Sequence, residues 1–265
     1  WLQRAERLTV VDHLELIPAQ ALPTFDSGNI ESYIHRIPGL SERYFYLNDD
    51  VFFGAPVNVD DWFWPGGFYV AWSDEPEVLG ETLREDATSL ENASRLSHQW
   101  LSHKAAKSMS GEYRSMAPLY EKVPRTFAHS PRPMLKSVLF ELELEAPELF
   151  EGVRSTVFRR WDKPTIVSDF VLRWALAHDM ARVKDYEHSY ISTGARGHIV
   201  ELEQLGLDFG ALDFFCINDT TDDAQDGDPR LVQVRKVLNT LLPHVSQNES
   251  LYSPVETSLQ ASVSV

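Results

Sequence analysis

The sequence predicts an α/β fold, a Rossmann-like, mostly parallel sheet flanked by helices, with a helical and aromatic insertion. Apolar and aromatic runs bounded by turn residues alternate with stretches whose apolar residues recur at helical spacing. A predicted helix leads directly into a predicted strand that ends in acidic residues, as in α/β folds, where ligands bind beyond the carboxyl ends of strands. At 265 residues and 43% hydrophobic, the chain can bury a sizeable core.

The N-terminal part supplies the first elements of this pattern. Residues 7–16 predict a short buried strand, and residues 26–37 predict a helix that has N-cap candidates at its start and ends at Pro38. Residues 43–47 are rich in aromatic residues and predict a second strand. We expect residues 57–72 to form an aromatic loop or hairpin that turns at Pro65.

The rest of the chain is mostly helical in pattern. Residues 84–118 predict a polar helix and loop. Three further helices are predicted: one starting near Pro133, one within 164–183, and one that begins after Asp228. The residues after Pro243 have little periodicity.

Composition excludes several classes of function. The formal net charge is −16, which argues against a nucleic-acid surface and against broad adhesion to anionic lipid. The single cysteine, Cys216, excludes an intramolecular disulfide and a cysteine-based zinc cluster, and its apolar neighbours indicate a buried thiol. No apolar run approaches the roughly 20 residues of a membrane span. Because the chain shows no signal sequence and opens without Met, we expect it to be an internal part of a longer protein.

Two strand ends carry the same pair of residues. Asn48-Asp49-Asp50 follows the strand at 43–47, and Asn218-Asp219 follows the apolar run at 214–217. Asn and Asp also suit ordinary turns, so either pair alone is weak evidence. Together they suggest that carboxylates and amides converge on one site, where Asp49, Asp50 and Asp219 would hold Mg²⁺ or Mn²⁺.

Other polar residues are candidates for chemistry. Glu31 and His35 lie at i, i+4 beside Arg36, a pattern that also fits a surface ion pair. His129 precedes a predicted helix, which suits either a structural hydrogen bond or an acid, base or phosphate-binding group. Arg159 belongs to a basic cluster with Arg160 and Lys163, which is typical of a phosphate site or of a solvated turn.

These motifs together resemble the Stealth proteins, a family of sugar-1-phosphate transferases. Residues 22–57 are similar to the family's second conserved block and residues 123–177 to its third, with His129 and Arg159 at the family's positions. Residues 214–220 resemble the fourth block, and the segment around Asn92 resembles the linker between the second and third. The first block has no counterpart, so we expect an N-terminally incomplete catalytic domain.

The resemblance implies transfer of hexose-1-phosphate from a UDP-sugar such as UDP-GlcNAc to a glycan hydroxyl, with release of UMP. It implies catalytic roles for Asp49, Asp50, His129 and Arg159, with Mg²⁺ or Mn²⁺ as cofactor. The general base stays open among Asp49, Asp50 and His129, and Arg125 or Arg160 would give secondary help. The residues implied to line the sugar or nucleotide pocket are Glu31, His35, Arg36, Asn48, Asn92 and Asn218.

Domain limits and location follow from the same resemblance. We expect a catalytic domain over 1–243, with a variable insertion at 58–118, and a loosely attached tail at 244–265. The expected place is the bacterial cytoplasm at the inner face of the membrane, in capsule or exopolysaccharide synthesis, with the Golgi lumen as the alternative.

Two other functions remain open. The first is a metal-dependent glycosyltransferase that moves the sugar alone and therefore releases UDP. The second is a non-catalytic carbohydrate-binding protein whose stacking platform is Trp62, Trp64, Phe68 and Trp72.

Overall fold

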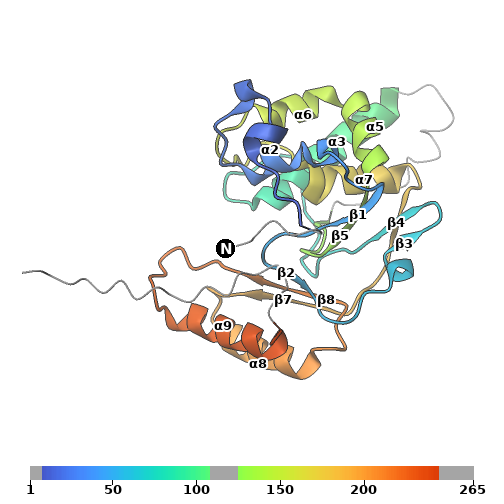
Figure 1. The fold of residues 1–265 in the computed structure, drawn as a ribbon. Helices are drawn as coiled ribbons and strands as arrows, with labels where there is room; N and C mark the ends of the chain where they lie inside the picture. The colour runs from blue at the N-terminus through green and yellow to red at the C-terminus, as the bar shows by residue number, and fades with distance from the viewer. Residues whose placement is uncertain (1–7, 108–124, 245–265) are drawn as a thin grey trace, which may run out of the picture.

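The computed structural model describes residues 8–107 and 125–244, and Figure 1 shows helices on both sides of the strands. The strands are β1 (Arg43–Tyr46), β2 (Val51–Phe53), β3 (Phe63–Trp64), β4 (Gly67–Val70), β5 (Arg132–Leu135), β6 (Ala181–Val183), β7 (His188–Ser192) and β8 (Phe214–Asn218). The α-helices are α1 (His13–Leu16), α2 (Ser27–Glu31), α3 (Ser89–Lys107), α5 (Lys136–Glu145), α6 (Pro147–Arg154), α7 (Val171–Ala177), α8 (His198–Asp208) and α9 (Pro229–Leu241). Short 3₁₀ turns are η1 (Ala19–Ala21), η2 (Ile34–Arg36) and η3 (Val59–Asp61), and η4 (Ile166–Phe170) is a π-helical turn that runs into α7.

The predicted mixture of helices and strands is confirmed, but the described strands form three small sheets in place of one mostly parallel sheet. Their orders are β1-β5, β2-β8-β7 and β3-β4-β6. The β7–β8 and β4–β6 pairs are parallel, whereas β1–β5, β2–β8 and β3–β4 are antiparallel. The strands are only two to five residues long, and strands that follow one another closely, such as β1 and β2, join different sheets, so no long parallel sheet forms.

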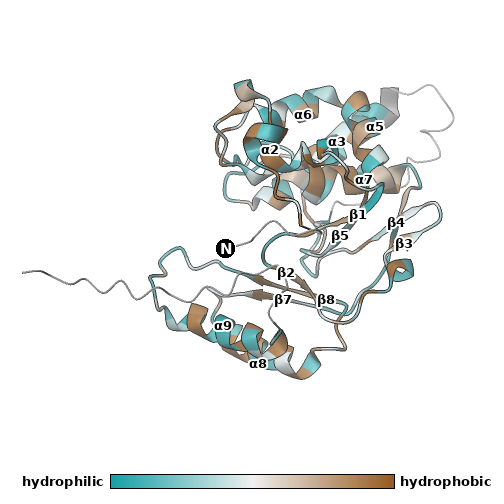
Figure 2. Ribbon diagram, in the orientation of Figure 1, coloured by the Kyte–Doolittle hydropathy of each residue, from teal (hydrophilic) through white to brown (hydrophobic). Residues whose placement is uncertain are grey.

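Two hydrophobic cores lie on opposite sides of the strands. The larger core packs α5, α6, α7 and η4 against β4 and β5, and the smaller one packs α8 and α9 against β7 and β8. The strands β2 and β8 are mostly hydrophobic along their length, whereas the covering helices alternate in hydropathy (Figure 2). This alternation follows from the one-sided burial of each helix.

The prediction of a strand over residues 7–16 is wrong. Residues 9–12 have no regular structure, and His13–Leu16 form α1. The Asp12 side chain accepts a hydrogen bond from the Leu14 N–H at 2.8 Å, so a local N-cap starts a helix there. Val10, expected at the strand's centre, is 49% exposed.

The helix predicted over 26–37 begins where expected but is interrupted. Asp26 caps α2 by accepting from the Gly28 N–H at 3.0 Å. The Ser32 hydroxyl then donates to the Asn29 carbonyl at 2.7 Å, and the chain continues as η2. A side chain that bonds its own backbone in this way competes with continued helix formation.

The other helix predictions are largely confirmed, with shifted starts. Pro133 lies in β5, and α5 starts only at Lys136. The 164–183 segment contains η4, α7 and then β6. Asp228 caps α9 by accepting from the Arg230 N–H, with Pro229 as its first residue, as predicted.

The aromatic insertion contributes two of the four proposed platform residues to the core, whereas Trp64 and Trp72 are partly exposed. The β3–β4 hairpin turns at Pro65–Gly66, and Gly67 is required where β4 passes Met180, because an added Cβ would lie 1.8 Å from the Met180 carbonyl oxygen. Trp62 and Phe68 are buried, and Trp72 stacks on Phe127 with ring centroids 4.4 Å apart. Residues 108–118 of the insertion and 245–265 of the tail lie outside the described residues.

Candidate active site

The two Asn-Asp segments meet at one edge of the β2-β8-β7 sheet. Because β2 is antiparallel to β8, the residues just before β2 lie beside the end of β8. The Ile217 N–H donates to the Asp50 carbonyl at 3.0 Å, which fixes the two segments to each other. The two Asn-Asp segments therefore converge as predicted, with Asp49 and Asp50 in the turn between β1 and β2. The predicted grouping of Asp49, Asp50 and Asp219 around one metal is not confirmed.

A cavity of about 390 Å³ opens at this edge between the strands and α9. Both Asn-Asp segments contribute to its wall, and α9 closes the other side. Its lining residues are Asp49, Asp50, Phe52, Ile217, Asn218, Asp219, Val234 and Leu238.

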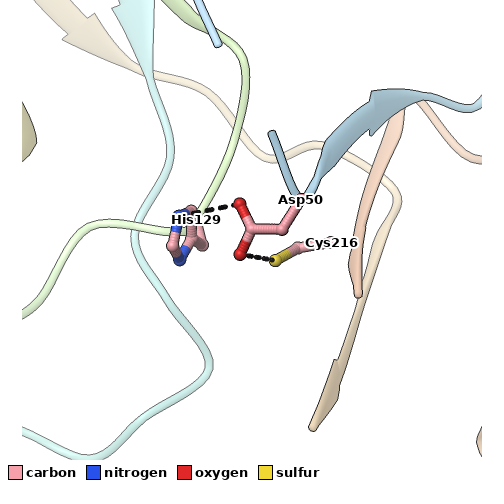
Figure 3. Close-up of side chains that lie close together, drawn as sticks. All are labelled: Asp50, His129 and Cys216. Atoms are coloured by element: carbon pink, nitrogen blue, oxygen red, sulfur yellow. Dashed lines mark hydrogen bonds and ion pairs between the residues drawn. The ribbon is translucent and has the colours of Figure 1, made fainter. Parts of the chain in front are cut away.

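Asp50 lies between two other reactive side chains (Figure 3). Its Oδ1 is 3.4 Å from His129 Nε2, and its Oδ2 accepts a hydrogen bond of 3.4 Å from the Cys216 thiol. Donor atoms of these three residues all lie within 4.8 Å of one another. Asp49 and Asp219, predicted to share a metal with Asp50, do not join this group.

The surroundings of His129 favour its neutral form. Burial lowers its pKa first, and the charge of Arg132 lowers it further, against the opposing effect of Asp50. Nε2 is 2.7 Å from Asn48 Nδ2, which fits an amide that donates to an unprotonated ring nitrogen. Asp50 Oδ1 has no hydrogen-bond partner, so the 3.4 Å approach of Nε2 is a contact and not a formed bond.

The Cys216 thiol is a structural donor to Asp50. Cys216 is fully buried in β8, as its apolar neighbours predicted, and burial raises its pKa well above the ordinary value, with the Asp50 charge adding to the effect. A protonated thiol is neither a nucleophile nor a metal ligand.

Tyr190 is a site residue that the sequence did not indicate. Its ring stacks on His129 with centroids 6.5 Å apart, and its hydroxyl accepts from Asn218 Nδ2 at 2.9 Å. It reaches this position only because β7 pairs in parallel with β8, where Tyr190 lies opposite Cys216. A long-range strand pairing of this kind leaves no local signal in the sequence.

Glu31 enters the same region from α2. It is 8% exposed, and Tyr46 in β1 donates to its Oε1 at 2.8 Å. Burial raises its pKa, against the lowering effects of the Tyr46 hydrogen bond and of Arg132 and Arg159. Arg159 is exposed and donates to the Ser27 hydroxyl at the start of α2. Its charge lowers the pKa values of both Glu31 and His129, which links it electrostatically to the same region.

Three predicted pocket residues have structural partners instead. His35 is fully buried and lies 2.7 Å from Glu143 Oε2, and Arg36 donates to the other oxygen of that carboxylate at 2.5 Å. Asn92 is fully buried and bonds both the N–H and the carbonyl of Arg84. These bonds hold α3 and the α2–η2 segment in place and leave the three side chains engaged away from the Asp50 cluster.

A hard cation would fit the carboxylate and amide oxygens at this sheet edge better than it would fit the group formed by Asp50, His129 and Cys216. A divalent cation such as Mg²⁺ prefers carboxylate and amide oxygens, and Asp50 Oδ1 is buried without a partner. Asp49, Asn218 and Asp219 line the cavity beside it. Asp219 already has hydrogen-bond partners, since its Oδ1 accepts from the Thr193 hydroxyl and the Thr221 N–H. The hydrogen bonds from Thr221 are the main cause that lowers the pKa of Asp219.

Comparisons with known proteins show what the sequence is similar to. Residues 1–70 match the family model described as Stealth protein CR2, conserved region 2. An exopolysaccharide phosphotransferase of Streptomyces coelicolor is 32% identical over 231 residues, which cover 84% of this chain and 22% of that protein. The exopolysaccharide phosphotransferase CpsY of Mycobacterium tuberculosis is 32% identical over 224 residues, 83% of this chain and 39% of the relative. That of Nocardia farcinica is 27% identical over 258 residues, 96% of this chain and 48% of the relative.

The matched region contains the segment that resembles the second conserved block. The chain belongs to the Stealth family, and its similarity to exopolysaccharide phosphotransferases extends over most of its length. It spans less than half the length of the relatives just named. Across the described residues, no helix is both long and apolar enough to cross a bilayer.

Proposed function

We propose that the protein transfers a sugar-1-phosphate from a nucleotide sugar, UDP-GlcNAc or a similar donor, to a hydroxyl of a glycan acceptor. The printed names of the relatives support a transfer of phosphate-containing groups in exopolysaccharide synthesis. The observation that carries the proposal is the position of His129 beside Asp50, at the edge where both Asn-Asp segments end.

In the proposed reaction, the acceptor oxygen attacks the β-phosphorus of the donor. The bond between that phosphorus and the bridging oxygen breaks, and UMP leaves with that oxygen. The acceptor proton passes to a base, and the sugar phosphate becomes a phosphodiester. Such transfers depend mainly on positioning and on stabilisation of phosphate charge.

His129 Nε2 is the proposed base. Its lowered pKa keeps the nitrogen unprotonated near pH 7, and Asn48 fixes the ring orientation. Asp49 and Asp50 are the other residues that sequence reasoning left open for this role. Because Asp50 faces His129, we assign it to stabilising the protonated form of the histidine.

Mg²⁺ or Mn²⁺ is the proposed cofactor, held by Asp49 and Asp50 with help from Asn218 and Asp219. When bound, such a cation would neutralise charge on the diphosphate. Arg159 would stabilise the transferring phosphate, since its guanidinium matches phosphate oxygens. Glu31, next to Tyr46, remains a proposed contact for the donor.

The bacterial relatives support a role in building a cell-surface polysaccharide. We place the reaction on the cytoplasmic side of the membrane, where bacteria make nucleotide sugars.

Product analysis tests this function directly. The 265-residue chain and the longest natural polypeptide that contains it are incubated with nucleotide sugars, Mg²⁺ and a glycan acceptor. Release of UMP supports phosphotransfer, whereas release of UDP favours a glycosyltransferase. Asp50→Asn should lose UMP formation, while Asp222→Asn, in an exposed loop, should keep it. Glycan binding that survives Asp50→Asn, with no turnover from any donor in either wild-type form, would favour the binding-protein alternative.

A further inference from the structure

Arg132 is a buried arginine with unmade hydrogen bonds. It lies in β5 opposite Tyr46 of β1, and only 3% of its surface is exposed. Neither Nε nor Nη1 has a hydrogen-bond partner. A buried charge without partners is strongly unfavourable, so an arrangement of this kind calls for an explanation.

Other buried arginines in the described chain do not share this property. Arg95 donates to the carbonyls of Leu79 and Gly80 and to Asn92. Arg173 donates to both carboxylate oxygens of Asp169 and to the Ser94 hydroxyl. The fold can therefore satisfy a buried guanidinium, and the unmade bonds of Arg132 are specific to its position.

Arg132 lies close to residues of the candidate active site. Its partner in the β1–β5 pair, Tyr46, donates to Glu31. The carboxylates of Glu31 and Asp50 act on its guanidinium, and Arg132 acts in turn on His129. Two carboxylate oxygens of this group, Glu31 Oε2 and Asp50 Oδ1, also lack partners. Hydrogen-bond donors and acceptors without partners therefore lie in one region, and the protein alone does not pair them.

We propose that Arg132 binds the anionic oxygens of a diphosphate, close to the unpaired carboxylate oxygens of Glu31 and Asp50. Its identification as the donor's diphosphate rests on the proposed function. A phosphate group offers several charged acceptors in a geometry that matches the guanidinium fork. A neutral sugar hydroxyl lacks the charge, and a further carboxylate would add repulsion to Glu31 and Asp50. A diphosphate that arrives with a divalent cation brings acceptors for Arg132 and positive charge for the carboxylates.

This assignment gives the site two arginines with different positions. Arg159 is exposed and already bonded to Ser27, whereas Arg132 is fixed in a paired strand. Because a fixed guanidinium loses little freedom on binding, Arg132 provides affinity for the diphosphate as well as charge.

The test measures binding of inorganic pyrophosphate with Mg²⁺ by isothermal titration calorimetry. Arg132→Gln should weaken binding by about tenfold to a hundredfold, the usual effect of losing charge-assisted hydrogen bonds. Arg132→Lys should be intermediate, because it keeps the charge but not the fork. Arg43→Gln, an exposed arginine at the other end of β1, should bind as the unmodified protein does. Thermal unfolding of each variant establishes that it is folded.

A measurement on the unmodified protein covers the case in which Arg132→Gln does not fold. The Nε–H resonance of Arg132, assigned by its absence in Arg132→Lys, should shift when Mg²⁺–pyrophosphate is added. An unchanged resonance, or a folded Arg132→Gln that binds pyrophosphate as tightly as the unmodified protein, would overturn the assignment. If pyrophosphate binding does not depend on Arg132 but UMP still forms, only the role of Arg132 is wrong. If pyrophosphate binds through Arg132 but no UMP forms, only the proposed function is wrong.

Discussion

His129 Nε2 is the atom on which the proposed chemistry depends. Asn48 approaches it at 2.7 Å and Asp50 at 3.4 Å, and burial keeps its pKa below the ordinary value. A base with these contacts is fixed in orientation and unprotonated at neutral pH. The acceptor hydroxyl would then replace the Asn48 amide as the hydrogen-bond partner of Nε2.

The first prediction at this scale concerns the base. His129→Gln keeps a polar side chain of similar length but cannot take up a proton. We expect kcat for UMP formation to fall by about 10²–10⁴, the usual contribution of general acid–base catalysis. Steady-state kinetics measure the change, with the exposed His13→Gln as control. Retention of kcat within about threefold in a folded His129→Gln would remove the histidine from the mechanism.

Cys216 allows a second prediction at the residue scale. Because burial raises the pKa of its thiol and the group donates to Asp50, iodoacetamide should label it far more slowly in the folded protein than in urea. Mass spectrometry of labelled peptides gives both rates. Rapid labelling of the folded chain at pH 7 would mean that the thiol is accessible and partly ionised, contrary to the structure.

At the scale of elements, the short helix α2 brings Glu31 into the site and depends on Asp26. This buried carboxylate caps α2 at Gly28 and also accepts a hydrogen bond of 2.6 Å from the Thr156 hydroxyl. One side chain therefore fixes α2 to the residues that follow α6. The position of Glu31 depends on this connection, since α2 is only five residues long.

Asp26→Ala should lower the free energy of unfolding by about 2–3 kcal/mol, because it removes the cap and leaves the buried Thr156 hydroxyl without this acceptor. Asp12→Ala removes the exposed cap of α1 and should cost about 0.5–1 kcal/mol. Urea denaturation followed by circular dichroism compares the two. Equal losses for both variants would contradict a special role for Asp26.

The contact between His35 and Glu143, which joins η2 to α5, predicts how the free energy of unfolding depends on pH. Burial lowers the pKa of His35, despite its contact with Glu143. Burial alone would raise the pKa of Glu143, but hydrogen bonds from Arg154 and His35 lower it overall. Both groups bind fewer protons in the folded state than in the unfolded state, so acidification favours unfolding.

The free energy of unfolding should therefore fall as pH decreases below about 6.5, where His35 in the unfolded chain begins to take up a proton. The Glu143 contribution is lost at lower pH, below about 4.5. Urea denaturation at pH 7.5 and 5.5 measures the first part. His35→Gln should be less stable at pH 7.5 and should show a smaller difference between the two pH values. A His35→Gln protein with the same pH dependence as the unmodified chain would assign the effect to other groups.

At the scale of the whole molecule, the sequence predicted the components of the site better than their arrangement. The Asn-Asp pairs, His129 and the buried Cys216 carry local signals, and the structure brings them to one sheet edge. The antiparallel β2–β8 pairing, the approach of Tyr190 and the burial of Arg132 arise from strands far apart in the chain. Periodicity within one segment cannot specify which distant strand it will pair with, so a single parallel sheet was predicted where three small sheets form.

Local chemistry also explains the smaller errors. Asp12 starts a helix inside a segment whose valines favour a strand, and Ser32 interrupts a helix whose isoleucines favour continuation. His35 and Arg36 look like site residues by spacing, but Glu143, over 100 positions away in the chain, engages both. Only the tertiary structure reveals that partner.

The fate of the donor's β-phosphate tests the central claim most directly. The donor is UDP-GlcNAc labelled with ³²P at the β-phosphorus, incubated with the protein, Mg²⁺ and a glycan acceptor. The label should move to the acceptor in a phosphodiester and be absent from the released nucleotide, and Asp50→Asn and His129→Gln should abolish this transfer. Label that stays in UDP while unlabelled sugar joins the acceptor would contradict the claim.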